Sequence, residues 1–292
     1  MPCTRTIILI SVAMIAFAGN SLLCRAALRD TSIDAASFTT IRIISGAFML
    51  WLVVLLRGGT SGCKGSWFSA SALFVYAAGF SFAYMSLSAA TGALLLFGSV
   101  QATMISHGIW AGERMDRLQL IGFVLAFGGL VGLLLPGLSS PPLYGSVLML
   151  GAGMAWGIYS LRGRGTGDPT RVTAGNFLRA APLAAALSVM TLGNASLDAS
   201  GAWYAIASGA LTSGLGYVIW YGVLPALKAT HAATVQLSVP VIAALGGSVF
   251  LGEPITLRLV LAAVAILGGI AMVILEKQTA ADGQHAATSN RP

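Results

Sequence analysis

The sequence predicts an all-α polytopic membrane protein in which ten transmembrane helices form two inverted repeats of five around a central cavity. Three observations lead to this fold class. The 292 residues are 57% hydrophobic and only 9% charged, whereas soluble domains carry about 25% charged residues. Long apolar segments follow one another along most of the chain. The second half of the chain repeats landmarks of the first half in the same order.

Ten apolar segments approach or exceed the length that a bilayer-crossing helix needs, which is roughly 20 mostly apolar residues. The first is longer than the apolar core of a signal peptide and is followed by Arg25 and Arg29, so we expect an uncleaved first helix. The polar residues 276–292 are expected to form a disordered tail. The ten expected spans are 7–24, 35–56, 67–88, 92–110, 118–136, 143–161, 173–192, 201–223, 230–250 and 257–275.

The 16 basic residues are distributed unevenly between the two sides of the membrane that these spans imply. Most lie in the termini and in the even-numbered loops, whereas the opposite loops hold only Arg25, Arg29 and Arg258. Because cytoplasmic loops carry the excess of Lys and Arg, we expect both termini on the cytoplasmic side of a bacterial-type inner membrane. The net charge of +7 therefore indicates topology and not a nucleic-acid partner.

An internal repeat divides the chain into residues 1–137 and 138–275. Residues 90–113 and 229–253 both begin Ala-Thr-x-Ala and both end in Gly-Glu, and a Gly-Gly pair follows in the next span of each half. A unit with an odd number of spans enters the membrane in the opposite sense when repeated, so the halves are expected to be inverted. Many secondary transporters have this architecture and bind substrate between the repeats. The other matched landmarks are Tyr84 with Tyr221, Thr91 with Thr230 and Arg42 with Arg179.

These landmarks resemble the drug/metabolite transporter superfamily, in its ten-helix branch with two EamA-type repeats. The resemblance covers residues 7–275. Chain length and short loops are similar to those of the YddG-type amino-acid exporters. The resemblance implies export of aromatic and other neutral amino acids and related metabolites, from a cavity lined by helices 1, 3, 4, 6, 8 and 9. It is carried by Gly112-Glu113 and Gly252-Glu253, by Gly128-Gly129 and Gly268-Gly269, and by Arg42 and Arg179.

Polar residues inside the spans are candidates for substrate binding, because they are costly in a bilayer and usually face a cavity or a partner. The Gln101 amide could meet a carboxylate or a zwitterion, or make an ordinary interhelical hydrogen bond. Pro240 frees a backbone carbonyl near Gln236 for a substrate ammonium, or simply kinks the helix. Asn20 could contact substrate or bond a neighbouring helix. The full set of cavity candidates is Asn20, Tyr76, Phe80, Tyr84, Phe97, Ser99, Gln101, Trp156, Gln236 and Ser238.

Aromatic residues of the spans fall into two groups. Tyr76, Phe80 and Tyr84 lie on one helical stripe and, with Phe97 and Trp156, could wall a pocket for aromatic side chains or form ordinary packing. Other tryptophans lie near span ends, where aromatic belts contact the membrane interface, and they are expected to lie outside the site. These are Trp51, Trp67, Trp110, Trp203 and Trp220.

Three ionisable residues have two interpretations each. Arg42 and Arg179 lie inside spans at related depths. They either extend to the interface, or form gate contacts or hold loop carbonyls as the two halves move. His107 in the fourth span is either a satisfied core residue or a proton site.

Several absences bear on mechanism. No Asp or Glu lies well inside any expected span, which favours facilitated transport over proton antiport, with proton coupling left as an alternative. The sequence contains neither a Walker P-loop nor an HExxH motif, and its three cysteines form no metal-binding pattern. We therefore expect no ATP drive, no cofactor, no metal and no enzymatic activity.

The expected partners are a small-molecule substrate, amino acids by the resemblance, and membrane lipids. A monomer is compatible with the sequence. The alternatives are an exporter of another small metabolite or drug on the same scaffold, a protein that binds without moving solute, and an intramembrane enzyme.

Overall fold

The computed structural model describes residues 4–58, 64–112, 116–137, 140–163, 168–224, 227 and 235–289, with the backbone alone from 275 onward. All regular secondary structure within these ranges is helical. The elements are α1 (Thr4–Asp30), α2 (Ala35–Leu56), α3 (Trp67–Tyr84), α4 (Ala89–Trp110), α5 (Arg117–Leu134), α6 (Leu143–Arg162), α7 (Pro169–Met190), the 3-10 turn η1 (Leu192–Asn194), α8 (Ala199–Ile206), the π-helix η2 (Ala207–Leu215), α9 (Gly216–Val223), α11 (Ser238–Leu251) and α12 (Leu257–Ser289).

Seven helices in the described part of the chain are long and apolar enough to cross a membrane: α1, α2, α3, α4, α5, α7 and residues 257–274 of α12. The chain is therefore a polytopic helical membrane protein. α6 lies in the expected range 143–161, the continuous run of α8, η2 and α9 lies in 201–223, and α11 lies in the second part of 230–250. Helices thus fall in all ten expected ranges, although the number of ten membrane crossings stays a prediction.

The two Gly-Glu sequences end helices by means of their glycines. Gly112 and Gly252 have positive φ values of 90° and 63°, the left-handed region that glycine occupies without strain and that commonly terminates helices. Glu113 lies outside the described residues. Both glycines therefore lie just past the last residue of their helix, α4 and α11 respectively.

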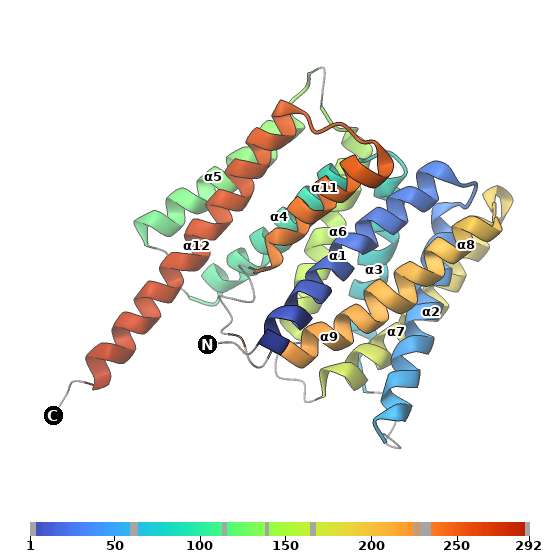
Figure 1. Cartoon of the computed structure of the whole chain (residues 1–292), viewed down its shortest axis with the longest axis horizontal. Coiled ribbons are helices and arrows are strands. Elements are labelled where there is room, and N and C mark those ends of the chain that lie inside the picture. The colour runs from blue at the N-terminus through green and yellow to red at the C-terminus, as the bar shows by residue number, and fades with distance from the viewer. Residues whose placement is uncertain are drawn as a thin grey trace.

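The helices pack as one bundle with a peripheral pair, as Figure 1 shows. α5 and α12 lie side by side at one edge, α4 and α11 come next, and the other helices form the rest of the bundle. Two ends of this bundle are used below as landmarks. The α3–α4 end holds the turn between α3 and α4, and the α6–α7 end holds the C-terminus of α6 and the N-terminus of α7.

The contacts between helices follow the internal repeat. If α1 corresponds to α6, α3 to the run of α8, η2 and α9, and α4 to α11, then a contact between two helices is matched by a contact between their counterparts. α3 packs against α6, and α1 packs against α8, η2 and α9. α4 packs against α6, and α11 packs against α1. α2 packs against η2, and α3 packs against α7. The contacts of α2 with α7, α4 with α11 and α5 with α12 each join a helix to its own counterpart.

Glycines allow α5 and α12 to approach closely. A Cβ at Gly122 would lie 2.5 Å from the carbonyl oxygen of Gly269, and a Cβ at Gly269 would meet the carbonyl oxygen of Gly122. Gly129 faces Ala265 on the partner helix in the same way, whereas Gly128 and Gly268 face open space. In each Gly-Gly pair, therefore, the second glycine forms the helix contact.

α12 continues as a helix to Ser289, beyond the expected end of the span at residue 275. The sequence predicts a disordered tail for residues 276–292, and the disorder of this tail in solution stays a prediction.

The glycine contact predicts different effects for two adjacent alanine substitutions. Gly269→Ala places a methyl group against the backbone of α5, so we expect it to lower the free energy of unfolding by about 1–3 kcal/mol. Gly268→Ala is the matched control, because it makes the same change one residue away in open space. Thermal melting of both variants in detergent measures the difference, and equal melting temperatures would contradict the close contact.

Candidate functional site

The larger cavity, of about 530 Å³, lies between helices of both halves of the chain. α1, α3 and α4 contribute side chains from the first half, and α6, η2 and α9 contribute from the second. Its lining extends from mid-helix residues such as Asn20 and Phe80 to Pro169 and Leu227 near the α6–α7 end. This size lies within the range of small-molecule sites, about 300–1,000 Å³.

Stacked aromatic rings form much of the wall. Trp156 lies between Tyr76 and Tyr217, with ring centroids 4.8 and 5.2 Å away. Phe80 follows Tyr76 on α3 at 5.5 Å, and Phe17 contacts the Tyr217 ring at 5.8 Å. Such walls bind apolar and aromatic groups through large contact areas and favourable ring geometry.

A hydrogen-bonded network lies against this wall and joins four elements. Arg42 Nη2 donates to the Tyr76 hydroxyl at 2.9 Å, and Arg42 Nε donates to Ser213 Oγ at 3.4 Å. Asn20 Nδ2 also donates to the Tyr76 hydroxyl, at 3.3 Å, and Asn20 Oδ1 accepts from Ser208 Oγ at 2.7 Å. The network therefore connects α1, α2, α3 and η2.

The π-helical geometry of η2 brings its polar side chains to this network. Ser208 and Ser213 reach α1 and α2 respectively, and a Cβ at Gly209 would collide with the Arg42 carbonyl oxygen. π-helical segments are rare and occur frequently at functional sites. The Gly- and Ser-containing sequence ASGALTSGL allows this close packing.

Seven of the ten predicted cavity residues line the cavity. Gln101 lies in the wall with 4% of its surface exposed, and no described residue makes a hydrogen bond with its side chain. Among the described residues, its amide therefore makes no interhelical hydrogen bond. Leu237 separates the helical residues 235–236 from α11, and Pro240 falls in the first turn of α11, so the interruption lies about one turn before Pro240. The seven residues are Asn20, Tyr76, Phe80, Phe97, Gln101, Trp156 and Gln236.

The other three candidates lie outside the wall and make structural hydrogen bonds. Tyr84 is fully buried, and its hydroxyl donates to the Ala89 carbonyl at 3.3 Å. Ser99 Oγ donates to the Leu150 carbonyl at 2.8 Å, and Ser238 Oγ donates to the Val235 carbonyl, just before α11, at 2.7 Å. Tyr84 continues the predicted stripe only as a support, because its ring packs edge-on against Phe80 at 4.7 Å.

The ionisable candidates have three different environments. Arg42 is 2% exposed, so the interpretation that it extends to the interface is wrong. Arg179 is half-buried, and its Nη1 donates to the Gly175 carbonyl in its own helix at 2.9 Å. His107 is exposed in the last turn of α4 and is absent from the cavity lining, so it is not a core residue.

Sequence reasoning missed several wall residues. Trp220 was placed in the interfacial belt, but it is 6% exposed and lines the cavity. Its ring contacts Phe17 edge-on at 6.0 Å. Trp51, Trp67, Trp110 and Trp203 are exposed, as expected of belt residues. The missed aromatic and polar wall residues are Phe17, Ser21, Ser160, Thr212, Tyr217, Trp220 and Tyr221.

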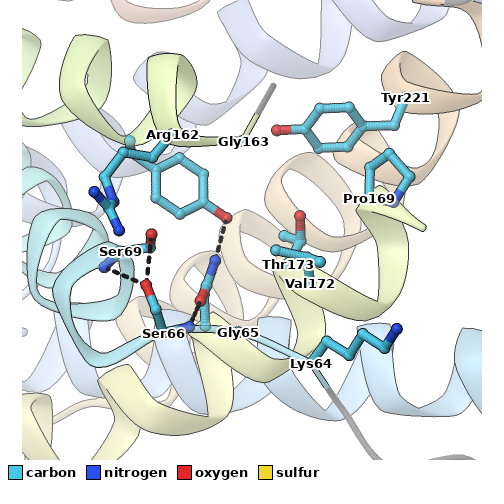
Figure 2. A pocket seen from close by; sticks show the side chains of 12 residues that line it. Lys64, Gly65, Ser66, Ser69, Arg162, Gly163, Pro169, Val172, Thr173 and Tyr221 are labelled. Carbon is cyan, nitrogen blue, oxygen red and sulfur yellow. Dashed lines mark hydrogen bonds between the residues drawn. The ribbon is translucent and has the colours of Figure 1, made fainter. Parts of the chain in front are cut away.

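A smaller cavity of about 280 Å³ adjoins the larger one at the α6–α7 end and shares Pro169 and Tyr221 with it. Figure 2 shows how hydrogen bonds fix one side of this smaller cavity. Ser66 N donates to Asn176 Oδ1 at 3.0 Å, and Asn176 Nδ2 donates to the Tyr159 hydroxyl at 3.4 Å. These contacts hold the start of α3 against α7.

The α3–α4 end is tied by an ion pair. Arg25 Nε on α1 donates to Glu253 Oε1 at 2.9 Å, and Glu253 Oε2 accepts from Ala89 N, at the start of α4, at 2.7 Å. Arg25 Nη1 also donates to the Tyr84 carbonyl at 2.9 Å. Glu253 therefore joins the end of α11 to α1 and α4.

The loop before α2 is held at the same end by Asp34. Its Oδ2 accepts from Ser196 N at 3.0 Å, and its Oδ1 accepts from the first amides of α2. Burial tends to raise the pKa of Asp34, but hydrogen bonds from Ser37, Ser196 and Ala36 outweigh it and lower the pKa below its ordinary value.

Comparisons with known proteins agree with this fold. Residues 143–275 match the EamA-like transporter family. An uncharacterized protein from Pseudomonas aeruginosa is 57% identical over 275 residues, covering 94% of this chain and 96% of that protein. The uncharacterized transporter YvbV of Bacillus subtilis is 25% identical over 295 residues, covering 94% and 92%. A crystal structure of a protein with 20% identity covers 94% of this chain and 98% of its own, with a TM-score of 0.67, which shows a shared fold.

The apolar helices and these relatives define a multi-pass membrane transporter of small molecules. The chain belongs to the EamA-like transporter family, within the drug/metabolite transporter superfamily. This is a family of transporters and not of enzymes.

The ion pair predicts a strong effect of Glu253→Gln. This change leaves Arg25 without its counter-charge in a largely buried position, so we expect the free energy of unfolding to fall by roughly 3 kcal/mol. Asp30→Asn is the control, because it removes a carboxylate from an exposed pair with Arg29, and exposed pairs contribute about 0–1 kcal/mol. Melting of both variants in detergent tests this, and equal stability losses would show that the Glu253 pair has no special role.

Proposed function

We propose that this protein exports aromatic and other neutral amino acids and related small metabolites across a bacterial inner membrane by alternating access. The observation that carries the proposal is the aromatic-walled cavity, which extends toward the α6–α7 end while Arg25 and Glu253 tie the α3–α4 end. A cavity that approaches one end of a bundle whose other end is tied is what one state of an alternating-access carrier requires. The repeat architecture supports the same mechanism.

Two inverted halves of five spans each, residues 1–137 and 138–275, form part of this proposal. The arrangement in two halves is supported by the matched contacts that corresponding helices make, and by the packing of α5 against α12 through their glycines. In this arrangement one half rocks against the other around the cavity.

We further propose that the α6–α7 end faces the cytoplasm, together with both termini. The support is the excess of basic residues in the connections on that side of the predicted topology. The described structure would then represent a state closed toward the outside.

We assign substrate contact to the seven predicted residues that line the wall, and we assign a supporting role to Tyr84, Ser99 and Ser238. The sequence places no carboxylate well inside any expected span, which supports facilitated transport. Arg179 and His107 lie away from the larger cavity, so any gating or proton role of these two would act indirectly.

Uptake into proteoliposomes tests the proposed function directly. Liposomes containing the full chain should take up labelled phenylalanine and leucine down their gradients, at rates that do not depend on a pH gradient. An absence of flux for every neutral amino acid would refute amino-acid export and favour another small metabolite or drug. Flux that requires a pH gradient would establish proton coupling instead.

Gln101→Ala tests whether the Gln101 amide, which has no hydrogen-bond partner among the described residues, contacts substrate. Loss of one neutral hydrogen bond to the substrate should lower flux roughly twofold to tenfold, with unchanged amounts of protein in the membrane. Ser106→Ala is the control, because Ser106 is an exposed residue on the same helix. Equal flux for the two variants would leave Gln101 with a purely structural role.

A further inference from the structure

Arg42 carries a positive charge that no described carboxylate balances. Its guanidinium is buried against the rings of Tyr76 and Phe80, with its Cζ atom 5.2 and 4.8 Å from their centroids. The ion pairs of the described residues join other partners, and Arg42 Nη1 has no hydrogen-bond partner among them. Buried charges in membrane proteins are costly and commonly mark the path of an ion or substrate.

The charge of Arg42 reaches the cavity through Tyr76. The Tyr76 hydroxyl oxygen accepts from Arg42 Nη2 at 2.9 Å and from Asn20 Nδ2 at 3.3 Å. These two bonds occupy the two acceptor positions of a hydroxyl. The hydroxyl proton is donated to no described residue, and Tyr76 lines the cavity. A residue of the wall therefore has a phenol proton with no acceptor among the described residues, and the Arg42 cation donates to the same phenol.

We propose that the Tyr76 hydroxyl binds the carboxylate of the transported molecule and that Arg42 acts behind it as a positioning residue. This inference rests on the proposed function and names what its substrates share. A carboxylate would accept the free phenol proton in a charge-assisted hydrogen bond. The negative charge of that carboxylate would also balance the positive charge of Arg42. The aromatic wall formed by Trp156 and Tyr217 would hold the apolar remainder of the molecule.

The same geometry makes the amino group of an amino acid dispensable. The described residues that line the cavity include no Asp or Glu, so a substrate ammonium meets amides, hydroxyls, carbonyls and ring faces among them. A cation without a carboxylate would add a second positive charge near Arg42. Aromatic carboxylic acids should therefore bind with or without an amino group, whereas the corresponding amines should not bind.

Binding to the full chain in detergent, followed by tryptophan fluorescence, tests this with ligands of one shape. L-phenylalanine and 3-phenylpropionate carry a carboxylate, phenethylamine carries only an amine, and 3-phenylpropanamide is neutral. We expect the two carboxylates to bind at least tenfold more tightly than phenethylamine. Equal affinity for phenethylamine would overturn the proposal without any variant being made.

Variants test the assignment to Tyr76. Tyr76→Phe keeps the ring and should weaken carboxylate binding about tenfold to a hundredfold, the loss expected for one hydrogen bond to a charged group. Binding of 3-phenylpropanamide should change much less, so the ratio of the two affinities separates recognition from folding. Arg42→Gln should lower the same ratio, and Arg42→Lys should restore part of it. Tyr144→Phe, on an exposed tyrosine of α6, is the control. An unchanged ratio in Tyr76→Phe would overturn the proposal.

Flux measurements on the same samples separate this inference from the proposed function. Selective carboxylate binding without flux of any ligand would refute transport of these molecules and leave the Tyr76 site supported. Flux of phenylalanine together with an unchanged affinity ratio in Tyr76→Phe would support export and refute the carboxylate site.

Discussion

The hydrogen bond from Arg42 to Tyr76 is the interaction around which the candidate site is organised. A guanidinium inside a helical membrane bundle costs several kcal/mol unless its surroundings compensate it, and here the compensation comes from neutral groups. Tyr76, Ser213 and two aromatic faces surround the charge, and Asn20 joins the same hydroxyl from α1. These contacts orient α1, α2, α3 and η2 relative to one another. The charge of Arg42 also makes one part of the cavity wall favourable for a negatively charged ligand group.

The two ends of the bundle are held by different contacts, and the cavity extends toward only one of them. At the α3–α4 end, Glu253 joins α1, α4 and α11 through an ion pair and a helix cap. Toward the α6–α7 end, the larger cavity continues into a smaller one that shares its lining. An alternating-access cycle would have to separate Arg25 from Glu253 at one end while closing the other. The glycine contact between α5 and α12 lies outside this cavity and can persist while the ends change.

The positions of the helices could be predicted from composition and from the internal repeat. The face that each helix turns toward its neighbours could not. Apolar segments located the helices, and the Gly-Glu landmarks located two helix ends. Both signals lie within a short stretch of sequence: a run of apolar residues forms the helix, and a glycine with positive φ ends it. The positions of Trp220 and Arg42 within their expected spans suggested that the Trp220 ring and the Arg42 guanidinium reach the membrane interface, but both residues are buried. The face that a helix turns to its neighbours depends on contacts distant in sequence, such as Gly209 against the Arg42 backbone. The π-helix that contains the wall residue Thr212 has no signal in the periodicity of the sequence.

The central claim is that a buried cation, acting through one phenol, selects carboxylates in an aromatic-walled cavity. A structure of the full chain in lipid nanodiscs with 3-phenylpropionate bound tests it most directly. The account predicts ligand density between Trp156 and Tyr217, with a carboxylate oxygen within hydrogen-bond distance of the Tyr76 hydroxyl. A ligand bound in the same cavity with its carboxylate directed away from Tyr76, toward the α6–α7 end, would contradict it.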